Sequence, residues 1–182
     1  MRKLILYIAT SIDGLIAGNN GDLKWFDNFP NPKQTDYGYQ GFYDTVDTVI
    51  MGGKTFRAIA NMDVEWPYAG KTTYLISKTN KDPGIPGVSV LGENWETELK
   101  AILAQKGKNV WVVGGGELVG LLLKAGFIDT MILSQFPTIL GKGTPLFTHV
   151  YDFSKWELSR GRYFSNGVIQ TEYVRKISSK VQ

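Results

Sequence analysis

Short apolar runs alternate with segments of helical periodicity along most of this 182-residue chain. The runs are rich in β-branched and aromatic residues, which is typical of buried strands. This alternation predicts an α/β domain whose sheet is largely parallel and is covered by helices on both faces. Eight strands are expected at 3–9, 48–51, 72–77, 88–91, 109–113, 130–135, 156–163 and 168–174, and helices at 35–45, 54–60, 95–105 and 117–125.

The last two predicted strands flank the sequence Phe164-Ser165-Asn166-Gly167. Asn-Gly between two alternating runs is a strong hairpin signal, so the sheet is expected to end in a C-terminal antiparallel hairpin. Residues 19–39 lack periodicity and are too long for a simple connection, which is typical of a lid or binding loop. No repeat or linker interrupts the chain, so 1–176 is interpreted as a single domain and 177–182 as a C-terminal tail.

The chain has no cysteine and a single histidine, His149. Disulfides, thiolate zinc sites and cysteine nucleophiles are therefore excluded, and no metal site is expected. The remaining sources of chemistry are carboxylates, hydroxyls, the backbone or a bound cofactor.

The net charge of +3 comes from cations spread along the chain. Nucleic-acid binding needs clustered cations, so no nucleic-acid partner is expected, whereas a mild positive balance suits an anionic small ligand. The apolar run at the start is too short for a signal peptide and no run could span a membrane. We therefore expect a cytoplasmic protein with no membrane partner.

A strand-to-helix turn made of three glycines, Gly114, Gly115 and Gly116, is the strongest pointer to function. Without side chains, such a turn lets backbone N–H groups at a helix N-terminus approach a phosphate closely. The dinucleotide fingerprint G-x-G-x-x-G is not matched, because Gly120 comes one residue too late. A purely structural glycine turn therefore stays open as the alternative.

A second predicted strand also ends in glycines, Gly52 and Gly53, and Lys54 and Thr55 follow at the start of a helix. A third ends in Ser77-Lys78-Thr79. Ligands of open α/β sheets lie beyond the carboxyl ends of the strands, so these groups are expected to share one edge. Two such turns could clamp a dinucleotide, with the third tip at its adenosine ribose or 2′-phosphate. Alternatively, Lys54 is a solvated first-turn residue, Thr55 an N-cap and the third tip a polar loop.

Asp36 follows the long loop and is expected near the start of the first helix. Its carboxyl could face the ligand as a proton donor or anchor, or could equally be a solvated acid favoured by the helix dipole. Trp25 in the loop and Phe42 on the helix could cover a planar substrate, although aromatic residues at helical spacing often belong to the core.

These segments, taken in order, resemble the dihydrofolate reductase superfamily, and in particular the reductase domain of bifunctional riboflavin-biosynthesis deaminase/reductases and their stand-alone relatives. The resemblance covers nearly the whole chain. It is carried by Ile8-Ala9-Thr10-Ser11-Ile12-Asp13-Gly14-Leu15-Ile16-Ala17, by Val49-Ile50-Met51-Gly52 with Lys54-Thr55, and by Leu75-Ile76-Ser77, Val113-Gly114-Gly115-Gly116, Leu133-Ser134 and Pro137-Thr138-Ile139-Leu140-Gly141-Lys142-Gly143.

The resemblance implies a mostly parallel eight-stranded sheet with NADPH lying across its carboxyl edge, a non-proline cis peptide bond between Gly114 and Gly115, and a homodimer. It implies Trp25, Phe42 and Ser134 as substrate-binding residues. The implied cofactor-binding residues are Ala9 and Ile16 beside the nicotinamide, Gly52, Lys54, Thr55, Ser77 and Lys78 toward the adenosine phosphates, and Gly114, Gly115, Gly116, Glu117 and Leu118 at the pyrophosphate.

Three features depart from the resemblance. Relatives usually carry arginine at the position of Gly53, so one expected partner for the 2′-phosphate is missing and NADH stays open as the alternative to NADPH. The segment between Trp25 and Asp36 is longer than in dihydrofolate reductases, so Asp36 is matched to their active-site acid only by its distance from Met51. The zinc deaminase of the bifunctional enzymes needs His and Cys ligands that this chain lacks.

The resulting hypothesis is an NADPH-dependent reductase that transfers a hydride to a C=N or C=O carbon of a small heterocycle. The nearest match is 5-amino-6-(5-phosphoribosylamino)uracil reductase of riboflavin biosynthesis. Asp36, or a water it orients, would supply the proton, and burial is expected to raise the pKa of Asp36. The alternatives are a dihydrofolate reductase-type pterin reductase and a non-catalytic nucleotide-binding module.

Overall fold

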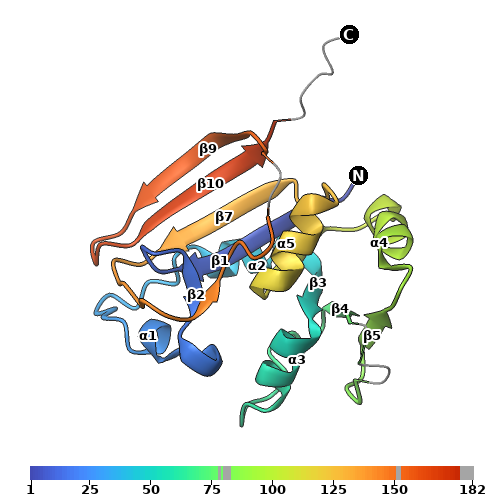
Figure 1. The fold of residues 1–182 in the computed structure, drawn as a ribbon, viewed down its shortest axis with the longest axis horizontal. Helices are drawn as coiled ribbons and strands as arrows, with labels where there is room; N and C mark the ends of the chain where they lie inside the picture. The colour runs from blue at the N-terminus through green and yellow to red at the C-terminus, as the bar shows by residue number, and fades with distance from the viewer. Residues whose placement is uncertain (78, 80–82, 151–152, 177–182) are drawn as a thin grey trace.

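The structure is a computed structural model that describes residues 1–77, 79, 83–150 and 153–176. A central sheet of eight strands runs through the molecule in the order β5-β4-β3-β6-β1-β7-β10-β9 (Figure 1). Adjacent strands are parallel from β5 to β7, and β10 runs antiparallel to both of its neighbours. The strands are β1 (Leu4–Thr10), β3 (Val46–Gly52), β4 (Thr72–Ile76), β5 (Val88–Leu91), β6 (Asn109–Gly114), β7 (Thr130–Gln135), β9 (Trp156–Tyr163) and β10 (Ile169–Arg175).

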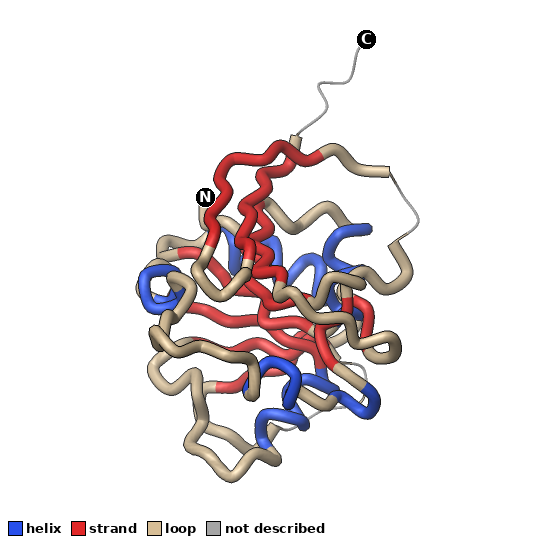
Figure 2. The backbone as a smooth tube through the Cα atoms, turned by 90° about the vertical axis from the view of Figure 1, so that its left-hand side faces the viewer, coloured by secondary structure: helices blue, strands red, loops and turns tan. Residues whose placement is uncertain are grey.

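Successive side chains of the central strands feed two separate cores, one on each face of the sheet. Leu4 and Leu6 of β1 belong to the core that α4 (Trp95–Ala104) and α5 (Gly116–Lys124) cover. Ile5, between them, belongs to the opposite core, which Phe42 of α2 (Tyr39–Tyr43) and Phe56 of α3 (Gly53–Ala60) complete. Figure 2 shows the helices on either side of the strands. The predicted sheet, its helices on both faces and its C-terminal hairpin are confirmed.

The long loop contains more structure than its sequence predicts. It holds a 3₁₀ turn at Asn19–Gly21 and the short helix α1 (Lys24–Asp27). Just before it, β2 (Leu15–Ala17) pairs with β8 (Thr144–Pro145) in a two-stranded sheet. The contact between β2 and β8 joins the start of the loop to a segment more than a hundred residues further along the chain.

The helix predicted at 35–45 is shorter in the structure. Tyr37 and Gly38 have positive φ angles of 54° and 83°, which interrupt a right-handed helix, so α2 begins only at Tyr39. Asp36 therefore lies before the helix. In α3, the residue that precedes the first helical residue is Gly52, so Thr55 is not the N-cap.

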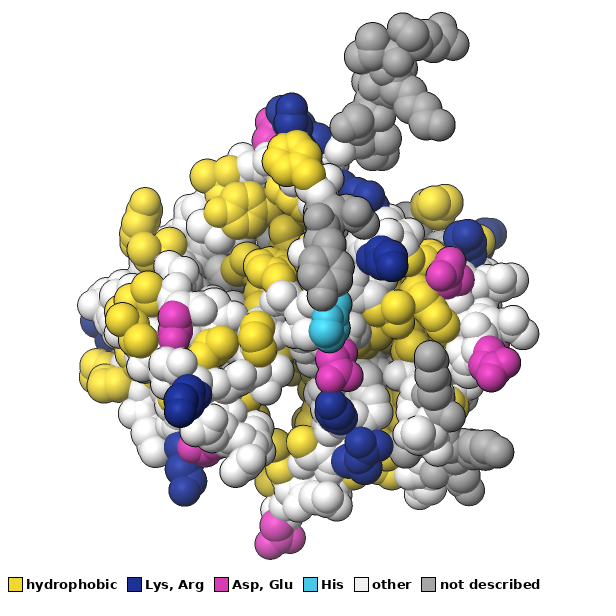
Figure 3. Space-filling view, in the orientation of Figure 1, with side chains coloured by type: hydrophobic (Ala, Val, Ile, Leu, Met, Phe, Trp, Pro, Cys, Tyr) yellow, Lys and Arg dark blue, Asp and Glu magenta, His cyan; other side chains and the backbone are white. Residues whose placement is uncertain are grey.

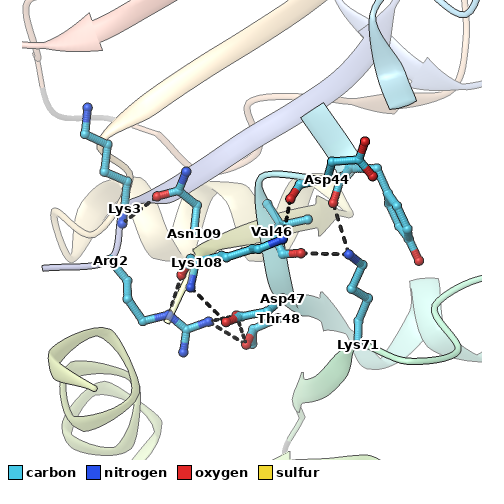
Figure 4. A network of polar contacts seen from close by, with 10 residues as sticks. Arg2, Lys3, Asp44, Val46, Asp47, Thr48, Lys71, Lys108 and Asn109 are labelled. Carbon is cyan, nitrogen blue, oxygen red and sulfur yellow. Dashed lines mark hydrogen bonds and ion pairs between the residues drawn. The ribbon is translucent and has the colours of Figure 1, made fainter. Parts of the chain in front are cut away.

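A polar network joins the amino ends of the strands (Figure 4). The buried guanidinium of Arg2 donates to the carboxylate of Asp47, to the Thr48 hydroxyl at 2.6 Å and to the Lys108 carbonyl at 2.6 Å. The Lys108 N–H in turn donates to Asp47 at 2.8 Å. These bonds fix the amino edge of β1, β3 and β6, and the glycine turns lie at the opposite edge. Within the described ranges, no helix is both long and apolar enough to cross a membrane.

Candidate active site

The two glycine turns lie side by side at the carboxyl edge of the sheet. Strands β3 and β6 are neighbours, and Met51 is paired with Gly114 in their register. A Cβ atom at Gly115 would lie 3.2 Å from the Thr55 hydroxyl of α3. The turn before α5 and the first turn of α3 are therefore in contact, as the clamp interpretation requires.

The first turns of α3 and α5 are also joined by an ion pair. Lys54 Nζ lies 2.8 Å from Glu117 Oε1, and both side chains are largely exposed. In Figure 3, Lys and Arg side chains gather in the lower centre of this face, between the positions of α3 and α5. An exposed pair contributes little to stability, so Lys54 can turn toward an anionic ligand at small cost.

The glycines of the 114–116 turn and of the helix that follows it are glycine for different physical reasons. Gly114 has a φ of 123°, which side chains disfavour, and its peptide bond to Gly115 is cis, as the resemblance implies. A Cβ atom at Gly116 would lie 2.1 Å from the carbonyl oxygen of Pro145, and one at Gly120 would lie 1.9 Å from that of Thr148. Gly116 and Gly120 therefore let segment 145–148 pack directly on α5. The structural explanation of the glycine pattern holds for these two positions.

Ser77 follows β4 and lies against the turn between β3 and α3. A Cβ atom at Gly53 would lie 2.9 Å from Ser77 Oγ. The register places Gly52 opposite Ile76, so the tip of β4 shares the edge with both glycine turns. Lys78, the other predicted residue of this tip, lies outside the described residues.

On the other side of the glycine turns, β1, β7 and β10 carry a polar floor. Ala9 is paired with Ser134, and Ser134 with Gln170, so the three residues form one row across the strands. The buried Gln170 amide donates to Ser134 Oγ at 2.9 Å and to the Tyr37 carbonyl at 2.9 Å. Gln170 Nε2 also lies 3.4 Å from the Tyr7 hydroxyl.

Tyr7 and Gln170 are candidate site residues that the sequence interpretation missed. Tyr7 stacks on Phe42 at a ring-centroid distance of 4.4 Å, and its hydroxyl donates to the Tyr37 carbonyl at 3.2 Å. Burial raises the pKa of the Tyr7 phenol; the Gln170 hydrogen bond opposes this shift and the charge of Asp36 adds to it. The sequence signal that could have found them is a polar side chain at an inward-facing position of an otherwise apolar strand.

The exposure and the pKa of Asp36 differ from what the sequence led us to expect. Its exposed carboxylate accepts hydrogen bonds from the backbone N–H groups of Gln40 at 3.0 Å and of Gly38 at 2.8 Å. These bonds lower the pKa of Asp36 below its usual value. The expectation that burial raises this pKa is wrong, because the carboxylate faces solvent while it holds the start of α2.

The loop places aromatic side chains above the sheet edge. Trp25 is half-buried and meets Phe136 edge to face at a centroid distance of 5.7 Å. Its indole Nε1–H is buried and has no hydrogen-bond partner among the described residues. A buried donor without an acceptor is costly, so this N–H suits an acceptor supplied by a ligand.

A cavity of about 380 Å³ lies beside the polar floor, between α2 and strands β1, β7, β9 and β10. Tyr7, Phe42 and Gln170 line it together with Arg160 and Arg162. This volume is within the range of small-molecule sites. The remaining predicted residues, Ile16 and Leu118, pack against the core on the α5 face, Leu118 buried and Ile16 half-buried. Nowhere in 1–77, 79, 83–150 and 153–176 do three His, Cys, Asp or Glu residues lie together to hold a metal ion.

The arrangement of strands and turns is that of the dihydrofolate reductase fold. Dihydrofolate reductase from Enterococcus faecalis, solved with NADP(H), superposes with a TM-score of 0.67 over 96% of each chain at 18% identity. The chain belongs to the RibD C-terminal domain family, whose pattern matches residues 2–170.

Some relatives span almost the same length as this chain, and others are longer. The protein YwjB of Bacillus subtilis (strain 168) is 36% identical over 174 residues, which are 96% of this chain and 98% of that protein. A Shewanella sp. PV-4 protein, provisionally assigned to riboflavin biosynthesis, is 31% identical with a TM-score of 0.85 over 96% of this chain and 99% of its own. The Thermotoga maritima diaminohydroxyphosphoribosylaminopyrimidine deaminase/5-amino-6-(5-phosphoribosylamino)uracil reductase has a TM-score of 0.73 and 15% identity, over 96% of this chain and 57% of its own.

Proposed function

We propose that this protein is a reductase that transfers a hydride from NADPH to a C=N or C=O carbon of a small heterocyclic substrate. The observation that carries the proposal is the meeting of two glycine turns at one sheet edge, next to the polar floor of Ser134, Gln170 and Tyr7. From β3 to β7 the edge spans three strand spacings, about 14 Å. This length suits an extended dinucleotide with its reactive end over the floor.

The residues at the edge fit the cofactor. The turn 114–116 would hold the pyrophosphate, with Leu118 and Glu117 in the following helical turn, while Lys54 and Thr55 would face it from α3. Ala9 has the smallest side chain that the floor could present to a nicotinamide ring, and Ile16 would border the same ring. When bound, the cofactor would supply the hydride.

The side chains of the protein would position the substrate and manage its proton. Trp25 would cover the substrate and donate its free indole N–H, and Ser134 and Phe42 would form the floor and wall of the pocket. Because Asp36 has a lowered pKa, it is a carboxylate at neutral pH and would orient a water rather than donate its own proton. Hydride transfer makes the substrate nitrogen or oxygen next to the reduced carbon basic; that water would protonate it, and the hydroxide left behind would take a proton from bulk solvent.

For the substrate, we propose a phosphoribosylaminopyrimidine. The family and the names of its relatives support a reductase of the riboflavin-biosynthesis type. The cavity beside the floor supports a substrate with an anionic substituent, because two arginines, Arg160 and Arg162, line it against a single carboxylate, Glu172. Dihydrofolate is the competing substrate that the fold suggests.

The test is a reductase assay on the purified protein. NADPH binding is followed by nucleotide fluorescence, and turnover by NADPH oxidation with a panel of aminopyrimidine ribosides, their 5′-phosphates and dihydrofolate. We expect NADPH to bind and one aminopyrimidine phosphate to be reduced by two hydrogens, as mass spectrometry would detect. Binding without oxidation of any panel member would favour a non-catalytic nucleotide-binding module, and no binding would refute the proposal.

Asp36→Asn tests the proton route, with Asp44→Asn as its matched control. Asp44 is also exposed and lies at the other end of α2, where it accepts a hydrogen bond from the Gln40 side chain at 3.0 Å. Asp36→Asn should lower kcat and leave NADPH affinity intact, and Asp44→Asn should change neither. Equal kcat in Asp36→Asn and the native protein would remove Asp36 from the mechanism. We also propose a homodimer in the cytoplasm; light scattering on the purified protein would check the dimer.

A further inference from the structure

Gly53 leaves a space at the sheet edge that is bordered by an arginine from the next helical turn. A Cβ atom at Gly53 would lie 3.4 Å from Nη1 of Arg57. Residues four positions apart on a helix lie on the same face, so the Arg57 side chain runs back toward the start of α3. Gly53 is the first residue of a right-handed helix, so its backbone conformation does not require glycine. Space, rather than conformation, is what glycine provides here.

The Ser77 hydroxyl approaches the same point from the tip of β4. Its Oγ lies 2.9 Å from the position of the absent Cβ atom. A guanidinium nitrogen and a hydroxyl, which come from different elements, therefore lie within 3.4 Å of a single point. Arg57 as a whole is exposed and Ser77 is half-buried, so a ligand could reach both from solvent. A planar guanidinium beside a hydroxyl is well suited to bind a phosphate monoester.

The strand order gives this pair a definite place along a dinucleotide. In the proposed function, the nicotinamide lies over β1 and β7, and the pyrophosphate lies at the turn after β6. The strands continue from β6 to β3 and β4, away from β1. Arg57 and Ser77 belong to the β3 and β4 side, where the adenosine ribose would lie. On that ribose, NADPH differs from NADH by a 2′-phosphate.

We propose that Arg57, together with Ser77, binds the 2′-phosphate of NADPH and makes the protein discriminate against NADH. This inference rests on the proposed function, because it assigns a contact within the same cofactor site. Lys54 is placed differently, since its ammonium is directed to Glu117 at the start of α5. Lys54 would meet the pyrophosphate that both nucleotides share, whereas Arg57 would meet the phosphate found only in NADPH.

The experiment measures the Kd of NADPH and of NADH without substrate, at one fixed salt concentration, for the native protein, Arg57→Gln and Arg57→Lys. We expect the native protein to prefer NADPH and Arg57→Gln to weaken NADPH about tenfold or more, while the Kd of NADH changes less than twofold. Arg57→Lys should keep part of the preference, because it retains the charge but loses the planar fork. Adenosine 2′,5′-bisphosphate should compete with NADPH in the native protein and lose most of its affinity in Arg57→Gln.

Lys124→Gln is the matched control. It removes one exposed cation from the last turn of α5, far from the helix start that belongs to the site, and should leave both Kd values unchanged. A second variant, Gly53→Ala, keeps every charge but places a methyl group 2.9 Å from Ser77 Oγ, so the Ser77 hydroxyl must move away from Arg57 and the helix start. Gly53→Ala should weaken the binding of NADPH more than the binding of NADH.

Each outcome bears on one of the two proposals. If the native protein binds neither nucleotide, the proposed function fails and this inference fails with it. If the native protein binds both equally, or if Arg57→Gln keeps the native preference, the assignment of Arg57 is wrong while the reductase proposal stands. If the nucleotide Kd values stay constant but Arg57→Gln raises only the KM of a phosphorylated substrate, Arg57 binds the substrate phosphate instead, and the inference is overturned.

Discussion

Gly116→Ala should destabilise the protein strongly, although alanine is the better helix former. Its methyl group would lie 2.1 Å from the Pro145 carbonyl oxygen and 2.8 Å from Thr148 Oγ1. An ordinary contact needs at least about 3 Å, so segment 145–148 or α5 must move by about 1 Å. Overpacking typically costs about 1–3 kcal/mol, and we expect the upper end because the obstacle is backbone. For a chain of this size, about 3 kcal/mol corresponds to a Tm about 6–12 °C lower.

The same substitution at Gly41 provides the control. Gly41 lies within α2, has no positive φ, and has no atom within 4 Å of the position that its Cβ would take. Gly41→Ala should therefore stabilise the protein by about 0.5–1 kcal/mol through helix propensity and loss of unfolded-state entropy. Urea and thermal unfolding, followed by circular dichroism without any nucleotide, would measure both.

The two variants together test whether Gly116 is glycine for packing. If Gly116→Ala unfolds like the native protein but loses NADPH binding, room for the phosphate explains this glycine, and the packing argument is refuted. If Gly116→Ala and Gly41→Ala destabilise equally, the loss is a general effect of the substitution and the contact with Pro145 is irrelevant.

Three further predictions concern the loops and the floor. The Asp13 carboxylate accepts bonds from Ser11 Oγ at 2.6 Å and from the Gly141 N–H at 2.8 Å, and these bonds lower the pKa of Asp13 to about 2. Because the pKa of Asp13 in the folded protein lies below its ordinary value, this stabilisation is present above pH 4 and is lost as the pH falls toward 2. The difference in Tm between the native protein and Asp13→Asn should therefore shrink over that interval. A constant difference would contradict the assignment. Gln170→Leu removes the amide's hydrogen bonds to the Ser134 hydroxyl and to the Tyr37 carbonyl, which keeps only its bond from the Tyr7 hydroxyl, and should cost about 2 kcal/mol in urea unfolding, whereas an unchanged midpoint would mean that water replaces the amide. Trp25→Phe removes an N–H that has no partner within the described ranges, so unfolding should change little while the KM of the reduced substrate rises; a Tm drop with unchanged KM would point to a purely structural role.

The arrangement of the sheet followed from the sequence because strand burial is a local pattern. Leu4, Ile5 and Leu6 alternate between two cores, and the uninterrupted apolar run that this requires is visible without a structure. The Asn166-Gly167 turn likewise predicted the final hairpin, since the turn residues fix the backbone locally. Both glycine turns were predicted at one edge of the sheet, because parallel strands share a carboxyl edge; that their strands, β3 and β6, are neighbours came only from the structure.

The state of each candidate side chain was decided by tertiary structure. Asp36 is exposed with a lowered pKa because Tyr37 and Gly38 take positive φ angles, which the helical pattern at 35–45 did not reveal. Gln170 reaches Tyr7 across 163 positions of the chain, a contact that exists only because β10 pairs with β7 and β7 with β1.

The turn at Gly114–Gly116 separates what the sequence determined from what only the tertiary structure decided. The sequence by itself determined that Gly114, Gly115 and Gly116 form a strand-to-helix turn, because the apolar runs on either side require one. It left open whether those glycines serve a ligand or the packing. Only the tertiary structure placed the Pro145 carbonyl against Gly116, Thr55 against Gly115 and Arg57 beside Gly53. The physical reason is that a glycine in the sequence shows only that a side chain is not tolerated at that position. The atoms that would clash with the side chain come from distant parts of the chain.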